Sequence, residues 1–126
     1  MLADDIAAYL ETAGVGTLNT DMFIGLLPDT TSNCIALYQY AGNAPELVGG
    51  LENPRLTVRV RNTTYANGQE KAQDVLKALH TLHEQTLNGT RYLYVRAVGS
   101  VNQLGRDHEK RALFTIDFIV TKELES

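Results

Sequence analysis

The chain has 126 residues and a formal net charge of −4, with 44% hydrophobic and 21% charged residues. This length and composition are those of one globular domain, expected to span residues 1–126. No apolar stretch approaches the roughly 20 residues that a membrane-spanning helix needs, so we expect no membrane partner. The acidic balance argues against a protein whose whole surface binds nucleic acid, but it allows a local basic patch.

Targeting and redox features are sparse. The first residues, MLADDIAAYLE, carry acids where a secretory signal peptide carries bases, so secretion by that route is not expected. Cys34 is the only cysteine, which excludes an intrachain disulfide. Because it lies in an apolar segment, we expect a small buried side chain rather than a reactive thiol.

The first forty residues predict one helix and two strands. Apolar residues recur at helical spacing from Leu2 to Ala13, and Gly14 follows as a stop signal. Residues 22–27 and 34–40 are predicted strands, separated by Pro28-Asp29 and a polar turn. We expect these two strands to pair as a hairpin.

A long loop and a strictly alternating strand follow. Residues 41–55 contain Gly49-Gly50 and Asn53-Pro54, and they are predicted to form an irregular loop. A loop of this length inside a compact domain is uncommon unless it binds a partner or is disordered. It leads into a predicted strand at 56–61, where apolar residues alternate with Thr57, Arg59 and Arg61.

The second half predicts a longer helix and two more strands. Asn62, Thr63 and Thr64 are candidate N-caps for a helix whose apolar stripe runs to Leu82 and which Gly68 weakens. Asn88-Gly89 predicts a tight turn before a strand at 92–98. The clearest alternation, at 114–121, predicts the last strand. The polar connection 99–111 is too long for a plain hairpin turn and predicts a projecting arm.

This order predicts an α+β fold: a single domain with a mainly antiparallel sheet of about five strands and two helices packed on one face. The residues expected to face the helices are Leu56, Val58, Val60, Leu93, Val95, Phe114, Ile116, Phe118 and Val120. The residues expected on the other face are Arg59, Arg61, Tyr92, Tyr94, Arg96 and Asp117. Tyrosine and arginine are enriched where subunits meet, so this face predicts a protein interface.

Signatures of catalysis and of cofactor binding are weak throughout. His80 and His83 stand three apart on the predicted helix, but no third metal ligand accompanies them. Gly49-Gly50 is not followed by the Lys-Ser/Thr of a phosphate-binding loop, and no nucleophile elbow occurs. We therefore expect no catalytic residue, no cofactor and no metal, and we do not expect an enzyme.

A nucleic-acid-binding module is the alternative hypothesis. Tyr92, Tyr94 and Arg96 alternate along one strand, and such a stripe can stack the bases of a single strand. The aromatic-glycine signature of the common RNA-binding sheet is missing, and the chain is acidic. A protein interface is therefore favoured over a stacking platform.

Five segments together resemble a known family. They are GLLPDTTSNCIALYQYAG at 25–42, LENPRLTVRVRNTTY at 51–65, KALHTL at 77–82, TRYLYVRA at 90–97 and LGRDHEKRALFTIDFIV at 104–120. In this succession the chain resembles the small tail terminator proteins of long-tailed bacteriophages, often labelled minor capsid proteins. Asn67-Gly68 departs from the helix-forming residues usual at that point in the family.

The resemblance implies a non-enzymatic ring, usually a hexamer, that caps the tail tube, stops its polymerisation and meets the head-completion proteins. Viral DNA would pass through the ring. The protein would be assembled in the host cytoplasm and would lie in the virion tail at the head–tail interface. Besides the sheet face, two projecting segments are expected to contact the tube or neighbouring subunits. Their candidate residues are Glu46, Leu51, Glu52, Arg55, Arg106 and Asp107.

Overall fold

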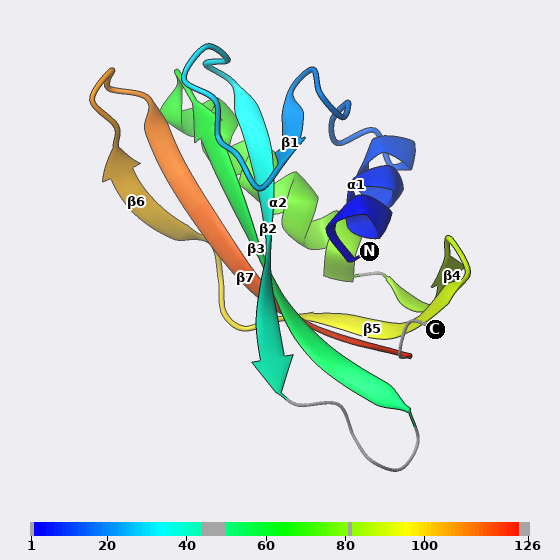
Figure 1. The fold of residues 1–126 in the computed structure, drawn as a ribbon. Helices are drawn as coiled ribbons and strands as arrows, with labels where there is room; N and C mark the ends of the chain where they lie inside the picture. The colour runs from blue at the N-terminus through cyan, green and yellow to red at the C-terminus, as the bar shows by residue number, and fades with distance from the viewer. Residues whose placement is uncertain (1, 44–49, 81, 124–126) are drawn as a thin grey trace.

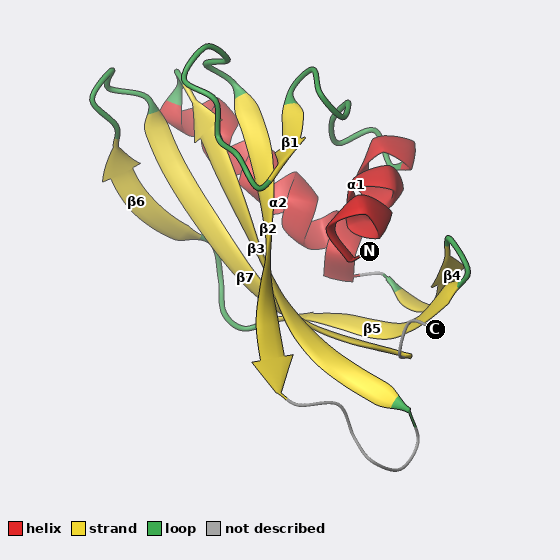
Figure 2. Cartoon of the chain, in the orientation of Figure 1, coloured by secondary structure: helices red, strands yellow, loops and turns green. Residues whose placement is uncertain are grey.

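The computed structural model describes residues 2–43, 50–80 and 82–123. These residues form a small α+β domain with two helices and one curled, mostly antiparallel sheet (Figures 1 and 2). The elements are α1 (Leu2–Thr12), β1 (Met22–Ile24), β2 (Cys34–Asn43), β3 (Leu51–Asn62), α2 (Tyr65–His80), β4 (His83–Leu87), β5 (Thr90–Ala97), β6 (Asn102–Arg106) and β7 (Ala112–Glu123). The fold class is as predicted. The estimate of about five strands was too low, because the described residues form seven strands. The two additional ones, β4 and β6, are short and lie in segments predicted as helix, turn or arm.

The sheet is organised around β7. The strand order is β1-β2-β3-β7-β5-β4, and β6 also pairs with β7. One edge of β7 pairs with β3, while β5 and β6 follow each other along its other edge. The long alternating segment predicted as the last strand therefore lies at the centre of the sheet, where both of its edges are paired.

The predicted hairpin between the first two strands was wrong. β1 pairs with β2 in parallel, with Met22 opposite Ile35 and Ile24 opposite Leu37. The chain leaves β1 at Gly25, which has a φ of +73°, and residues 25–33 return along the sheet before β2 begins (Figure 1). A return segment of this kind brings the second strand in beside the start of the first, so the two run in the same direction.

The described parts of the predicted long loop are almost entirely strand, while residues 44–49 lie outside the described residues. β2 and β3 form an antiparallel hairpin in which Tyr40 lies opposite Arg55 and Asn43 opposite Asn53. The register shifts between Tyr40 and Asn43, which places a bulge across from Pro54. Proline cannot donate to a ladder and is tolerated at bulges, so the Asn53-Pro54 pair, predicted as part of a loop, is accommodated within the strand. The end of β2 and the start of β3 extend past the helices in Figure 1.

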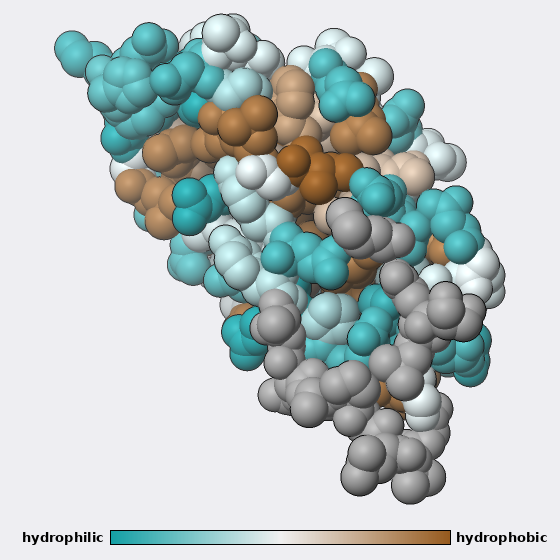
Figure 3. Space-filling model, in the orientation of Figure 1, coloured by the Kyte–Doolittle hydropathy of each residue, from teal (hydrophilic) through white to brown (hydrophobic). Residues whose placement is uncertain are grey.

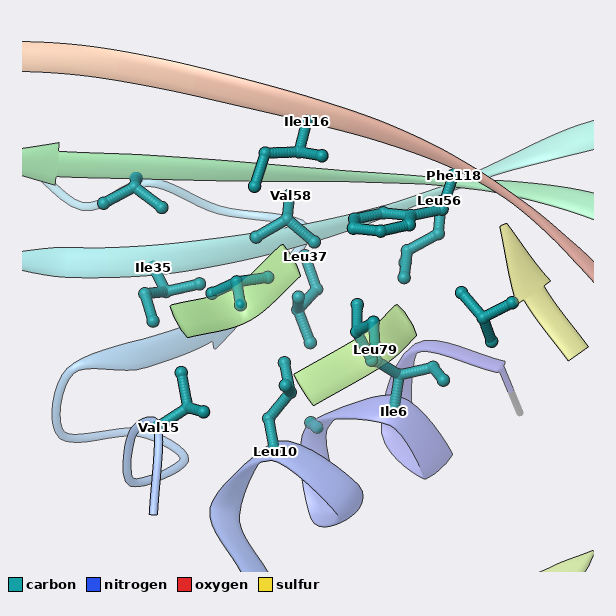
Figure 4. Close-up of a cluster of buried hydrophobic side chains, with 14 of the residues drawn as sticks. Ile6, Leu10, Val15, Ile35, Leu37, Leu56, Val58, Leu79, Ile116 and Phe118 are labelled. Carbon is teal, nitrogen blue, oxygen red and sulfur yellow. The ribbon is translucent and has the colours of Figure 1, made fainter. Parts of the chain in front are cut away.

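Both helices cover the same face of the sheet. Their buried side chains meet those of the central strands in one cluster, shown in Figure 4, where Ile6 and Leu10 of α1 point toward Leu56 and Val58 of β3. The residues predicted to face the helices are buried, except Leu93, which is half-buried. This single core fixes which face of the sheet remains for partners.

The second helix is shorter than predicted. Asn62 Oδ1 accepts a hydrogen bond from the Thr64 backbone at 3.0 Å in an Asx turn just before the helix begins. Thr64 itself occupies the N-cap position, since its carbonyl accepts the first helical hydrogen bond, from Gly68 at 3.0 Å. The helix ends at His80, and His83 begins β4. His80 and His83 therefore do not share a helical face, which corrects the prediction that placed both there.

The Asn88-Gly89 turn is confirmed. It joins β4 to β5 as a two-residue loop, with φ values of +49° at Asn88 and +82° at Gly89. Two positive φ values match the twist of a tight hairpin, and the Asn-Gly pair accepts them readily. The strand before this turn was missed because its residues are exposed and carry no apolar alternation.

Candidate functional site: the outer face of the sheet

We call the side of the sheet away from the helices the outer face. In β7 its residues are Leu113, Thr115, Asp117 and Ile119, which alternate with buried core residues. The register places these four beside Arg61, Arg59, Thr57 and Arg55 of β3. On the other edge of β7, Arg96 lies opposite Ile119 and Tyr94 opposite Thr121.

Three tyrosine–arginine neighbours stand on this face. The guanidinium carbon of Arg59 lies 5.6 Å from the centre of the Tyr38 ring, and that of Arg96 lies 6.0 Å from the Tyr94 ring. Tyr40 and Arg55 are opposite each other on β2 and β3. A cation over an aromatic face gains electrostatic energy and holds the arginine in place without neutralising it. The arrangement therefore presents preformed flat surfaces that carry positive charge.

The centre of the outer face is basic in an acidic chain. Arg55, Arg59 and Arg96 are exposed there, against one exposed acid, Asp117. The Asp117 carboxylate accepts a hydrogen bond from the Thr57 hydroxyl at 2.6 Å, so it is held by its own sheet. The prediction placed Arg59, Tyr94, Arg96 and Asp117 on this face, and the structure has them there. Their role as an interface stays a prediction.

The prediction for Tyr92 was wrong. Tyr92 is fully buried and lies on the helix side of the sheet. The register of β5 against β7 shifts between Tyr92 and Tyr94, so one extra residue is inserted there. A bulge changes which face each later residue occupies, and this one puts Tyr92 inside and Tyr94 outside. The bulge also explains why Leu93 is only half-buried.

Inside the core, Tyr92 belongs to a polar contact between layers. Its hydroxyl donates to one carboxylate oxygen of the buried Asp5 in α1, and Asn88 Nδ2 donates to the other at 2.7 Å. Buried carboxylates are tolerated when such donors satisfy them. Tyr92 therefore ties the first helix to β5.

The prediction that Arg61 is an exposed interface residue was also wrong. Arg61 points to the outer face but is only 3% exposed, because residues 25–33 pass over it. Its guanidinium donates to the carbonyl oxygens of Pro28 and, at 2.6 Å, Thr31. These bonds hold the return segment against the sheet, and so the residue supports the fold.

A second buried arginine holds the same segment. Arg111 donates to the Asp29 carbonyl at 2.9 Å and to the Asp107 carboxylate at 2.8 Å. Burial acts to raise the pKa of Asp107, but hydrogen bonds from Arg111 and the Glu109 backbone outweigh it, and the pKa lies below its usual value. Asp107, predicted as a docking residue, thus has an internal partner.

The remaining predicted candidates lie on the two hairpins. Arg55 is exposed, and Leu51 is half-buried near the start of β3. Glu52 pairs with Lys122 across the sheet, and so it too has an internal partner. Arg106 is exposed at the end of β6 and donates to the Lys110 carbonyl at 2.8 Å. Glu46 lies outside the described residues.

The outer face also carries apolar surface that the sequence pattern did not predict. Leu26, Val98 and Leu104 are about half exposed, at 58%, 53% and 48%. Figure 3 shows apolar side chains gathered on this side over the region of β6, β7 and the segment between β1 and β2. Tyr38 and Tyr40 were missed too, although their period-two spacing in the predicted strand 34–40 was a usable signal.

The described residues show few features of a chemical centre. Among them, no three His, Cys, Asp or Glu side chains gather as a metal site. Burial is the main cause that raises the pKa of the Cys34 thiol above its ordinary value, which disfavours the reactive thiolate. None of the helices in these ranges has the length and apolar character to cross a membrane. The candidate site in the described residues is therefore the surface of the outer face.

Comparison with known proteins decides the family. A family profile described as bacteriophage tail terminator protein matches residues 9–124. The chain belongs to the bacteriophage tail terminator family. It is thus a structural protein of the phage tail, in a family that is not one of enzymes. No curated protein sequence is similar enough to count as a match.

A chain in a solved structure has the same fold as this protein. It is a chain from the virion of a native gene transfer agent particle, with a TM-score of 0.77 and 14% sequence identity. The match covers 97% of this chain and 94% of the other. At that identity the likeness concerns the fold alone. Since the match spans nearly all of both chains, the two folds correspond over almost their entire length.

Proposed function

We propose that this chain is a ring-forming tail terminator. Six copies assemble at the end of the tail tube, stop its polymerisation and form the joint to the head-completion proteins, with DNA passing through the ring. The protein acts by shape and surface complementarity, without a catalytic residue or a cofactor. Its place is the virion tail at the head–tail interface, after assembly in the host cytoplasm.

The family match over residues 9–124 carries this proposal. The basic outer face supports it, because exposed tyrosines and arginines are the residue types that interface centres favour. A capping protein must also be asymmetric. One ring face has to bind the tube end, while the other must offer no site for another tube subunit.

The test is a tube-length assay with the cognate tail tube protein. Wild-type protein added during polymerisation should shorten the tubes in proportion to its concentration, and electron microscopy should show it at tube ends. A protein added after polymerisation is complete serves as the control, since it can bind ends but cannot shorten tubes. Unchanged lengths at saturating protein, with bare tube ends, would reject the proposal.

A nucleic-acid-binding module is the second candidate function. The observation that favours it is the set of tyrosine–arginine neighbours on the outer face, which could stack bases and contact phosphates. Such binding would weaken steeply as salt is raised. Titration of a fluorescent single-stranded oligonucleotide at two salt concentrations distinguishes it from the terminator function.

A further inference from the structure

The centre of the outer face and the helical layer carry opposite charge. At the centre of the outer face, three exposed arginines stand against one exposed acid. On the helical layer the balance is reversed, because four exposed acids stand against one exposed lysine. These residues are Asp4 and Glu11 on α1, and Glu70, Asp74 and Lys77 on α2. Lys71 on α2 is half-buried, and its ammonium donates to the Val15 carbonyl at 2.8 Å. Even when Lys71 is counted, the helical layer carries more acids than lysines.

The acids of α2 point away from the sheet. The buried side of this helix is formed by Gly68, Ala72, Val75 and Leu79. Glu70 and Asp74 are exposed and four residues apart, so they lie one turn from each other on the opposite side. Beside them, a groove of about 350 Å³ between the end of α1 and α2 is lined in part by Gly14, Asp74 and Lys77. The helical layer thus offers both an acidic ridge and a hollow.

We propose that the outer face of one copy packs on the helical layer of the next copy. This interface rests on the proposed ring, because it specifies how the subunits of that ring meet. A ring needs an interface between two different surfaces of the same chain, and here the two surfaces lie on opposite sides of one fold. Arg59 and Arg96 of one copy then face Glu70 and Asp74 of its neighbour.

A second copy fits the outer face better than a nucleic acid does. The complementary acidic surface is present on every copy, and opposite potentials steer two surfaces together. A nucleic acid, in contrast, is a polyanion and would be repelled by the net charge of −4 of the chain as a whole. The tyrosines held beside the arginines suit the desolvated centre of a protein interface.

The charge pattern permits a test with two variants of the full chain. The first carries Arg59→Glu and Arg96→Glu, which make both layers acidic. The second carries Glu70→Lys and Asp74→Lys, which make both layers basic. Neither variant can pair with itself, but each sheet face complements the helical layer of the other. Native mass spectrometry and sedimentation across a concentration series measure assembly, and thermal melting checks the fold.

We expect each variant alone to need at least about tenfold more protein to assemble than the wild type, with little change in melting temperature. A one-to-one mixture should assemble nearly as well as the wild type, with both variants in equal numbers in each ring. Lys110→Glu, at the turn between β6 and β7, is the matched control and should assemble normally.

Three results would overturn the interface: normal assembly by either variant alone, failure of the mixture to assemble, or a wild-type chain that stays monomeric throughout. Loss of oligonucleotide binding by the Arg59→Glu, Arg96→Glu variant, with assembly intact, would assign the outer face to nucleic acid instead. The tube-length assay separates the two proposals. If the variants assemble normally and the wild type still shortens tubes, only this interface is rejected. If the wild type leaves tube length unchanged, the terminator function is rejected.

Discussion

The hydroxyl of Tyr92 donates a hydrogen bond to the buried carboxylate of Asp5, which joins β5 to the first turn of α1. This contact uses a tyrosine that the sequence pattern assigned to the outer face. The same strand keeps Tyr94 and Arg96 exposed, so β5 contributes to the core and to the outer face within a few residues.

Tyr92→Phe should therefore weaken the fold and spare assembly. The change removes one donor from a buried carboxylate while Asn88 still donates to it, and we expect a loss of about 1–3 kcal/mol in the free energy of unfolding. Urea denaturation measures the loss, and native mass spectrometry measures assembly. Tyr94→Phe is the control and should leave stability within about 0.5 kcal/mol. Normal stability of Tyr92→Phe would show that the contact contributes nothing.

Arg61 and Arg59 provide a second comparison, because both side chains belong to the same side of β3. Arg61→Ala removes the donor to the Pro28 and Thr31 carbonyls and should destabilise the protein by about 3 kcal/mol or more. Arg59→Ala should change stability by about 0.5 kcal/mol at most, since the side chain is exposed. Equal effects of the two substitutions on the unfolding midpoint would contradict the burial of Arg61.

Gly68→Ala tests the packing of α2 on the sheet. By helix propensity alone the change should stabilise the helix by about 1 kcal/mol. A Cβ at this position, however, would lie 2.5 Å from Cε2 of Phe114 and 3.1 Å from Cβ of Asn62. We expect a net destabilisation of about 1–3 kcal/mol from overpacking. Asn67→Ala, one residue earlier and exposed, is the control and should be neutral or slightly stabilising.

The sequence could predict the parts of the fold whose signal is local. The alternation in β7 and in the second half of β3 identified core and outer faces correctly, and Asn88-Gly89 identified its turn. It could not reveal that residues 25–33 cover Arg61, because that contact joins segments about thirty residues apart in the chain. The alternation of apolar and polar residues could not reveal the bulge beside Tyr92 either. A bulge shifts which residues face the core, and no distinctive residue marks its position in the sequence. At the candidate site, the exposure of a side chain could thus be predicted only where no other segment covers it and no bulge shifts the strand.

The contact between Asp107 and Arg111 predicts a loss of stability in acid. The folded-state pKa of Asp107 lies below its ordinary value, so its stabilising contribution is present above about pH 4. The contribution disappears as the pH falls through the folded-state pKa. Asp107→Asn should lower the melting temperature at pH 7 and make it less sensitive to pH below about 4. Thermal melting from pH 2 to pH 7 checks this, and an unchanged acid limb would contradict it.

The hairpin of β6 and β7 carries one of the two segments predicted to contact the tail tube or neighbouring subunits, and Leu104 is its exposed apolar residue. All five residues of β6 are exposed, so a substitution there should leave the core intact. Leu104→Asp would place a charge where a partner must exclude water, and we expect about tenfold more protein to be needed for the same tube shortening. Ring mass and melting temperature should not change. Asn102→Asp, on the same exposed strand, adds the same charge without removing apolar surface and serves as the control. If Leu104→Asp shortens tubes as efficiently as the wild type, this hairpin does not dock on the tube, and the contact must lie elsewhere on the ring.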